Sequence, residues 1–455
     1  MKKFLFPLTA VASLLLAVAY FTTGCVSTTP DFRQTIRVAE EKVFPTLVYI
    51  RVVCKELSDG KNQKAVVSGS GVVITPDGEL LTNHHVIEKA TEIRCLLTNG
   101  ESYPAKLLGA DKDLDIALLK LERPEGAKPL PFAKLSDRGR EIGDVVLAMG
   151  APWGLARSVT MGIISCKDRY LEGDGQYTLW YQTDATISPG NSGGPLVDTD
   201  GTVVGINARG MRYSNQAFTI PSTIILDLLP NLRKHGNAHW AWTGLQIQPL
   251  HDFDKNIFFD ATNGVMVAGT DPGSPARKAG FKPNDRIVSI NGESVTATNH
   301  EDLPALERKL GRMPFDQDIT CKVVRGDKTL DIVFAPHEKG TVEGADKAFD
   351  RWGFTVKEIN RFDTPDLAFV AEDGGVFVSA IAWDGNAETS GLKTRDIIKT
   401  IDDQPVHTVA DVDAIYKAAM KKLDEKTKMR KTVIRNRREI QIVLNYLEDT
   451  EKENP

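Results

Sequence analysis

The sequence predicts a mainly β protein in which one all-β domain is followed by two smaller α+β domains. Between residues 44 and 221, short β-rich segments follow one another, separated by Gly, Pro, Asp and Asn, with few long helical periods. Closely spaced strands of this kind are typical of an antiparallel barrel or sandwich, and either one all-β domain or a pair of small barrels fits the pattern. The expected strands are Thr46–Cys54, Ser70–Ile74, Glu79–Thr82, Ile116–Leu121, Val145–Met149, Val159–Ser165 and Val203–Asn207.

A helix is expected at residues 223–234, where the all-β region ends. Its apolar side chains recur at helical spacing and would therefore share one face of the helix. These side chains are Ile224, Ile225, Leu228, Leu229 and Leu232.

Two further segments, each of roughly 100 residues, repeat one order of features: a strand, a helix of small residues, a Gly turn, a strand led by Asp and a polar turn. The first copy contains Gly264–Val267, Gly273–Ala276, Ala279–Phe281 and Asp285–Gly292. The second copy contains Gly375–Val378, Asn386–Ala387, Ser390–Leu392 and Asp396–Asp403. Repetition over this length predicts two copies of one domain.

These features divide the chain into seven parts. A signal peptide is expected at residues 1–25 and an N-terminal segment at 26–43, followed by the all-β domain at 44–236. The two repeats are placed at 240–337 and 350–448, with a linker at 338–349 that is rich in Gly and charge. Residues 449–455 form a polar, acidic tail.

The composition of the 455-residue chain is that of a globular protein, with 41% hydrophobic and 26% charged residues. A chain of this length is expected to hold several domains, since one domain usually has about 100–200 residues. The formal net charge of −5 argues against a nucleic-acid partner, which normally requires a concentrated basic patch.

The N-terminus predicts export. Lys2 and Lys3 precede an apolar run from Phe4 to Phe21, which matches a secretory signal, although an uncleaved membrane anchor is the alternative. Thr22–Cys25 resembles a bacterial lipobox, with Thr22 where Leu is usual. We therefore expect a periplasmic protein with lipidation at Cys25, anchored to the outer membrane.

Four other cysteines follow, at positions 54, 95, 166 and 321. This number is too small for a disulfide scaffold in a chain of this length. Cys54 and Cys95 lie in strand-like segments of the first domain, so they are either buried free thiols or a single disulfide.

The segment Gly190–Pro195 is a candidate for a nucleophilic serine, Ser192. Glycines beside such a serine permit unusual backbone conformations and let backbone N–H groups converge on a developing oxyanion. The expected oxyanion hole comprises Gly190, Asn191 and Ser192. A Gly-rich turn without catalytic function is the alternative for this segment alone.

A nucleophilic serine needs a general base and a carboxylate that orients it. His84 and His85 follow a predicted strand, and Asp115 is the polar residue directly before the apolar strand 116–121. The order His, Asp, Ser along the chain is that of chymotrypsin-type double barrels. Taken alone, the histidines could be ordinary loop residues and the aspartate a turn former.

Three local sequences resemble the motifs of the HtrA family of serine proteases. Thr82–Val86 is similar to the family's Thr-Asn-x-His-Val, which assigns the base to His85; residues 115–120 and 183–194 are similar to its Asp and Ser motifs. The resemblance covers residues 44–447 and implies a chymotrypsin-like double barrel with two PDZ domains. It implies a Ser192–His85–Asp115 triad acting by acyl transfer, with no metal and no cofactor.

The resemblance also implies a substrate pocket and a trimeric assembly. The specificity pocket would be formed by Ile187, Ala217 and Phe218, which supply no acidic group, so small or medium aliphatic residues are the expected substrates. The PDZ domains would bind apolar peptide C-termini through a loop of backbone N–H groups. These carboxylate loops are Trp242, Thr243, Gly244 and Leu245 in the first copy, and Arg351, Trp352, Gly353 and Phe354 in the second.

Two functions remain open at this point. The chain is either an endopeptidase that degrades unfolded exported proteins, or a peptide-binding and holding protein in which proteolysis is secondary or latent.

Overall fold

The computed structural model describes residues 32–56, 63–151, 158–173, 176–211, 216–253, 261–340, 344–370 and 374–447. The expected signal peptide, with Cys25 and its neighbours, lies outside these residues. Within the described part of the chain, no helix has the length and apolar character needed to cross a bilayer.

Two closed six-stranded β-barrels form the first half of the molecule, which resolves the choice left open by the sequence. The first barrel has the strand order β1-β2-β3-β6-β5-β4 and the second β10-β11-β12-β9-β8-β7. The strands are β1 Leu47–Glu56, β2 Gln63–Val73, β3 Glu79–Thr82, β4 Ala90–Leu97, β5 Ser102–Asp111, β6 Ile116–Leu121, β7 Val145–Gly150, β8 Ser158–Arg169, β9 Trp180–Thr183, β10 Pro195–Asp198, β11 Val203–Gly210 and β12 Ala217–Pro221.

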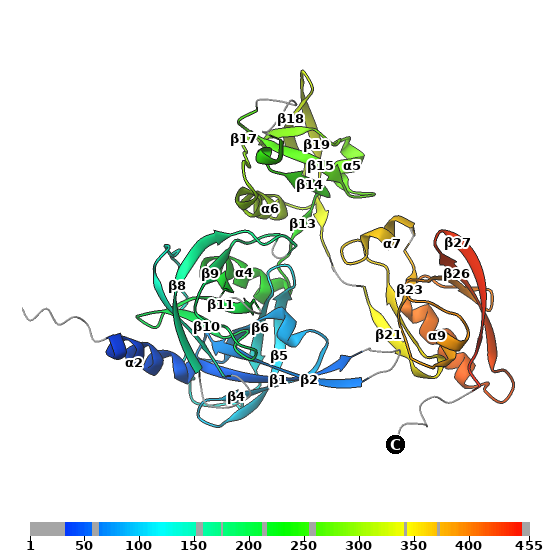
Figure 1. Ribbon diagram of the computed structural model, residues 1–455, viewed down its shortest axis with the longest axis horizontal. Helices are drawn as coiled ribbons and strands as arrows, with labels where there is room; N and C mark the ends of the chain where they lie inside the picture. The colour runs from blue at the N-terminus through cyan, green and yellow to red at the C-terminus, as the bar shows by residue number, and fades with distance from the viewer. Residues whose placement is uncertain are drawn as a thin grey trace, which may run out of the picture.

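Two helices cover the barrels. Helix α2 (Phe32–Val43) lies at the N-terminal end in Figure 1 and buries Ala39 and Val43 in the core cluster that joins the barrels. Helix α4 (Ser222–His235) packs Ile225, Leu228, Leu229 and Leu232 into the same cluster, which confirms the helix expected there. It ends at Gly236, whose φ of +75° is a common helix-stop conformation.

The cysteines of the first barrel are free thiols. Cys54 pairs with Ala90 and Cys95 with Ile50 in the β1–β4 ladder, so the two cysteines are separated along the strands. Burial raises the pKa of the Cys95 thiol to about 12.

The first sheet domain, residues 241–338, has the strand order β14-β15-β16-β18-β19, with β17 beside β16. A short ladder of β13 with β20 joins its two ends. Its elements are β13 Ala241–Trp242, β14 Leu245–Gln248, β15 Val265–Thr270, α5 Pro275–Ala279, β16 Arg286–Ile290, β17 Glu293–Ser294, α6 Leu303–Gly311, β18 Ile319–Arg325, β19 Lys328–Phe334 and β20 His337–Glu338.

The second sheet domain, residues 346–447, has the order β21-β22-β23-β24-β26-β27, with β25 beside β24. The linker expected at 338–349 therefore includes β21, a strand of this sheet. The elements are β21 Asp346–Phe349, β22 Phe354–Glu358, α7 Pro365–Val370, β23 Val376–Ile381, α8 Asn386–Thr389, β24 Ile397–Ile401, β25 Gln404–Pro405, α9 Val409–Met420, β26 Lys428–Arg435 and β27 Arg438–Asn445.

Both sheet domains lie beside the barrels in Figure 1. The first domain contacts the second barrel through Tyr177, whose ring stacks on Trp240 with centroids 4.2 Å apart. Arg308 on α6 donates to the carbonyl of Tyr177 over 2.5 Å. The Nζ of Lys339 lies 2.7 Å from the carboxylate of Asp113, two residues before Asp115. The loop before Asp115 is therefore bound by the residue that directly follows the first sheet domain.

Candidate active site

His85 and Asp115 form a paired imidazole and carboxylate in the first barrel. The Nδ1 of His85 lies 2.8 Å from one oxygen of Asp115, and the His85 backbone N–H donates to the other oxygen over 2.9 Å. The Asp115 side chain is 10% exposed, whereas that of His85 is 43% exposed. The carboxylate is therefore shielded from water while the imidazole remains accessible to a substrate.

The position of Asp115 depends on the turn that precedes β6. Asp115 has a φ of +52°, which is uncommon for a residue other than Gly. Its backbone carbonyl accepts hydrogen bonds from the Asn83 side chain over 3.0 Å and from the His84 N–H over 3.2 Å. Both the backbone and the side chain of Asp115 are thus fixed by the segment that contains His85.

Ser192 lies in the turn before β10, packed against the segment that leads to His85. Gly193 approaches this segment so closely that a Cβ there would lie 2.2 Å from the Ser70 carbonyl and 2.3 Å from the Thr82 hydroxyl. The φ of Gly193 is +84°, a second reason why another residue would be strained there. The Gly-rich sequence thus permits the contact between the two barrels at the site.

The Ser192 hydroxyl donates to the Ala208 carbonyl over 3.2 Å. Within the described part of the chain it forms no hydrogen bond to His85, so two of the three predicted triad residues are directly paired and the serine is turned aside.

Asn191, one of the three residues predicted for the oxyanion hole, is held inside the turn. The Asn191 N–H donates to the Ser188 carbonyl over 2.9 Å, and its side chain is buried beside Gly150. The backbone N–H of Asn191 is therefore already engaged within the turn in this conformation.

Ser70 fixes the Gly190–Ser192 turn, a role that sequence reasoning missed. Its hydroxyl donates to the Gly190 carbonyl over 2.6 Å and accepts from the Ala151 N–H, while its N–H donates to the Ser192 carbonyl. Ser70 is fully buried and comes from β2 of the first barrel. Its place in the Gly-rich segment 68–71 was the available signal.

The three residues predicted to form the specificity pocket are buried, but they lie in two different hydrophobic clusters. Ile187 and Ala217 belong to a small cluster inside the second barrel, whereas Phe218 packs into the larger core between the barrels. A Cβ on Gly210 would lie 2.5 Å from the Ile187 carbonyl, so the end of β11 runs directly beside Ile187. Ile187 and Ala217 come together, and Phe218 points elsewhere.

A cavity of about 500 Å³ opens beside His85 and Asp115. Its walls include Trp180 and Arg209 of the second barrel, as well as Phe362 and Asp363 of the second sheet domain. Both barrels and the second sheet domain therefore contribute to the wall of this cavity.

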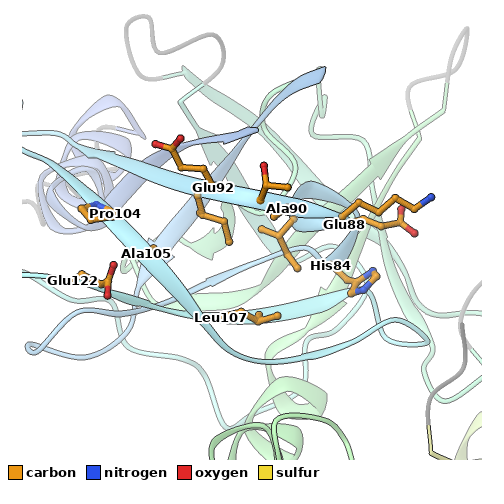
Figure 2. Close-up of a pocket in the computed structure, with 12 residues that line it drawn as sticks. His84, Glu88, Ala90, Glu92, Pro104, Ala105, Leu107 and Glu122 are labelled. Atoms are coloured by element: carbon orange, nitrogen blue, oxygen red, sulfur yellow. The ribbon is translucent and has the colours of Figure 1, made fainter. Parts of the chain in front are cut away.

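A second cavity, of about 550 Å³, lies on the other side of His84, between β4 and β5. Figure 2 shows His84 at one end of this cavity, with Glu92 and Glu122 at the other. His84 lines both cavities, but the carboxylate of Asp115 engages His85. The geometry agrees with the choice of His85 over His84.

The carboxyl group of Asp111, which lies four residues before Asp115, has a raised pKa. Burial, reinforced by nearby Asp113, raises the pKa of Asp111 to about 6. The carboxylate accepts hydrogen bonds from the Leu114 N–H over 2.7 Å and from the Trp240 indole N–H over 2.9 Å. Asp111 thus connects the chain before Asp115 to the start of the first sheet domain.

The two predicted carboxylate loops differ in their surroundings. In the first, the Thr243 hydroxyl accepts from the Leu245 N–H, and the Trp242 indole donates to Asp271. In the second, Trp352 is fully buried in the domain core and Arg351 donates to the carbonyls of residues 446 and 447.

Two protein-family profiles match the chain. The profile described as "Trypsin-like peptidase domain" matches residues 69–206, and the profile described as "PDZ domain" matches residues 244–333. These ranges correspond to the core of the two barrels and to the first sheet domain.

Curated proteins of similar sequence carry the name "Probable periplasmic serine endoprotease DegP-like". The one from Marinomonas sp. (strain MWYL1) is 35% identical over 360 residues, which cover 77% of this chain and 74% of that protein. The one from Chlamydia trachomatis serovar D is 32% identical over 361 residues, covering 78% and 71%.

Solved structures with similar folds include the HtrA-type protease AlgW with a tripeptide, at a TM-score of 0.60 and 29% identity, covering 69% of this chain and 98% of that chain. The serine endoprotease from Yersinia pestis aligns with a TM-score of 0.53 and 27% identity, covering 66% and 97%.

Proposed function

Because this chain belongs to the HtrA/DegP family of trypsin-like serine endoproteases, we propose that Ser192, His85 and Asp115 are its catalytic triad. The observation that carries the proposal is the paired His85 imidazole and Asp115 carboxylate beside the Gly-rich Ser192 turn. A general base held in one orientation by a carboxylate is what a serine nucleophile requires.

In the proposed reaction, the Ser192 Oγ attacks the carbonyl carbon of a peptide bond while His85 accepts the hydroxyl proton. Asp115 keeps the Nδ1–H of His85 directed at itself and stabilises the imidazolium that forms. His85 then donates the proton to the leaving amine. A water molecule repeats the attack on the acyl-enzyme and releases the second product.

The N–H groups of Gly190 and Ser192 would bind the oxyanion of each tetrahedral intermediate. Ser70 supports this role because it holds the Gly190 carbonyl and the Ser192 carbonyl. Such preorganised donors lower the barrier because they need no rearrangement as the charge develops.

The hydrogen bond from Ser192 to Ala208 indicates a resting conformation. A change of rotamer about the Cα–Cβ bond would turn the hydroxyl from that carbonyl toward His85, at a cost of the order of one hydrogen bond. We propose that substrate binding drives this change.

The pocket for the substrate side chain is proposed to lie between Ile187 and Ala217. Both are apolar, and neither brings a charge that would favour Lys or Arg. Cleavage after small or medium aliphatic residues is therefore expected, with Phe218 supporting the wall from the core rather than lining it.

The proposed substrates are unfolded or misfolded exported proteins, and the periplasmic location is supported by the names of the relatives. The first sheet domain would capture apolar peptide C-termini, and we assign the second sheet domain to the PDZ class as well. A homotrimer and a lipid anchor at Cys25 complete the proposal. A Cys25→Ser variant that stays membrane-bound would exclude the lipid as the anchor.

The decisive experiment is degradation of casein by the purified chain lacking residues 1–25. Wild type should cleave, and Ser192→Ala should lose activity by a factor of roughly 10⁴ or more. His85→Ala should be equally inactive, while His84→Ala serves as the matched control and should retain substantial activity. Inert wild type, even with apolar C-terminal peptides added, would favour the holding function instead.

A further inference from the structure

The ligand edges of the two sheet domains differ. PDZ domains bind a peptide C-terminus as an added antiparallel strand whose carboxylate meets backbone N–H groups of the loop before that edge. In the first domain this edge belongs to β14, which ends its sheet. The strand before the loop, β13, pairs with β20 instead. No described strand therefore covers the outer edge of β14.

In the second domain the corresponding edge belongs to β22, and β21 covers it. The two strands pair antiparallel, with Asp346 opposite Lys357 and Phe349 opposite Phe354. The ladder continues to the Glu358 N–H, which donates to the Ala345 carbonyl over 2.7 Å. β21 runs toward the loop at 350–353, which is the direction that a bound C-terminus would take.

The loop itself binds the end of β21. The Gly353 N–H donates to the Phe349 carbonyl over 2.9 Å and to the Asp350 carbonyl over 3.0 Å. In a PDZ domain the N–H groups of this loop receive the ligand carboxylate. The Gly353 N–H of this loop is therefore already engaged by the chain's own backbone.

Side chains of β21 also fill the space between β22 and α9. Phe349 is fully buried, and its ring centroid lies 5.1 Å from that of Tyr416 on α9. Ala348 is buried beside it. Lys347 lies 2.8 Å from Asp413, also on α9. The strand is thus held by its backbone, its apolar side chains and an ion pair.

We infer that the peptide groove of the second sheet domain is occupied by the chain's own residues 346–349. This inference rests on the proposal that the domain is of the PDZ class. The groove of the first domain is then the one available to peptides, and the second groove opens only when β21 leaves it.

If β21 leaves the groove, the connection between the two sheet domains also changes. The strand directly follows the segment that joins the two sheet domains, and Asp346 forms an ion pair of 3.0 Å with Lys89 of the first barrel. Release of four extended residues would lengthen the connection by roughly 13 Å. It would also break the ion pair with Lys89, which is a contact of β21 with the first barrel.

The test counts peptide sites on the full mature chain carrying Ser192→Ala. The probe is a labelled peptide with the sequence of residues 344–349, Gly-Ala-Asp-Lys-Ala-Phe, and a free carboxylate. Calorimetric titration should give about one site per chain, because a closed groove reduces apparent affinity by its open fraction. Two sites on the unaltered chain would overturn the inference.

Two variants shift the equilibrium in opposite directions. Lys347→Pro removes a backbone N–H from β21 and should expose a second site, whereas Lys347→Ala, which only loses the ion pair to Asp413, is the matched control. Cysteines at the directly opposed positions Ala348→Cys and Thr355→Cys should form a disulfide that keeps the second site closed until it is reduced. A folded Lys347→Pro chain with one site would contradict the inference.

Hydrogen exchange supplies a measurement that needs no variant. In the free wild-type chain, the amides of Lys347 and Phe349, which face β22 in this antiparallel ladder, should exchange as slowly as those of β22, and the peptide should leave them unchanged. Exchange of these two amides at the rate of an open loop would overturn the inference. Absence of peptide binding by the first domain would instead contradict the proposed function, and leaves the exchange result as the independent test of the closed groove.

Discussion

The two sheet domains share a framework but differ in their cores. In each, an arginine at the end of a strand clamps a buried aspartate through two hydrogen bonds: Arg325 with Asp285 at 2.6 and 2.7 Å, and Arg435 with Asp396 at 2.6 and 2.6 Å. The same arginines donate to the carbonyl of the preceding Gly turn. The turn and its clamp therefore define the repeat.

The difference lies on the same strand as each clamp arginine, four residues before it. Cys321 on β18 stands opposite Ile290, and Lys431 on β26 stands opposite Ile401 in the same register of the second sheet. Both side chains are fully buried. Among the residues that the structure describes, the Nζ of Lys431 has no hydrogen-bond partner, and it lies 3.8 Å from the Phe354 ring centroid. One inward position thus holds a thiol in one copy and an amine in the other.

This contrast teaches that the same framework can hold a buried amine in its core where aromatic rings surround that amine. A ring face attracts a cation and offsets part of the cost of burying it. In the second domain Trp352 and Phe354 both face the amine. The first domain has Thr243 and Leu245 at the corresponding places before and after the loop glycine.

The largest effect is expected from placing the lysine in the domain that lacks this aromatic environment. Cys321→Lys should destabilise the first domain by roughly 4 kcal/mol, because a fully buried amine loses several pKa units without a compensating partner. Denaturant unfolding followed by hydrogen exchange would assign the loss to this domain. Cys321→Met, which adds volume without charge, is the control, and an equal loss in both variants would show that packing rather than charge is responsible.

The next effect comes from the shared clamp. Arg325→Ala and Arg435→Ala should each cost about 3 kcal/mol, since removal of one partner leaves an uncompensated carboxylate that is almost completely buried. The same measurement applies to both variants. Losses that differ by more than twofold would contradict the view that the clamp serves the two domains equally.

The sequence predicted the two repeated domains and much of the candidate site. The Gly turn and the Asp-led strand identified both copies, because backbone conformation and the buried carboxylate depend on local sequence. Pairing partners depend on tertiary contacts, so β21 was assigned to a linker although Asp346–Phe349 is a strand of the second sheet. In the barrels, the predicted pairing of His85 with Asp115 is present and the Ser192 turn packs against the segment before His85. The hydrogen bonds of Ser70 and the buried position of Asn191 could not be inferred from residue type.

A smaller effect of opposite sign is expected in the second domain. Lys431→Met should stabilise it by about 1–3 kcal/mol, because the variant removes a buried polar group without a hydrogen bond. Burial lowers the pKa of Lys431 well below its ordinary 10.5, so below that pH the unfolded chain binds more protons than the folded chain. Wild-type stability should therefore rise with pH up to about 10.5, and the advantage of Lys431→Met should shrink over the same range.

Unfolding measured from pH 6 to pH 10 would test this dependence. A stability difference between Lys431→Met and wild type that stays constant across that range would contradict a neutral buried amine in the folded state. It would favour instead a lysine that keeps its proton through contact with the rings of Trp352 and Phe354.

The smallest effect concerns the start of a short helix in each sheet domain, α5 after β15 in the first and α8 after β23 in the second. The Ser274 hydroxyl caps α5 by accepting from the Arg277 N–H over 3.1 Å, whereas α8 of the second domain begins after Gly385, which has no side chain to do so. Ser274→Ala should therefore cost about 1 kcal/mol, and Ser274→Gly slightly less. The reciprocal Gly385→Ser should bring no equal gain, because its Cβ would lie 3.0 Å from the Ala382 Cβ. Thermal unfolding resolves these differences, and a gain of about 1 kcal/mol in Gly385→Ser would show that the two helix starts are interchangeable.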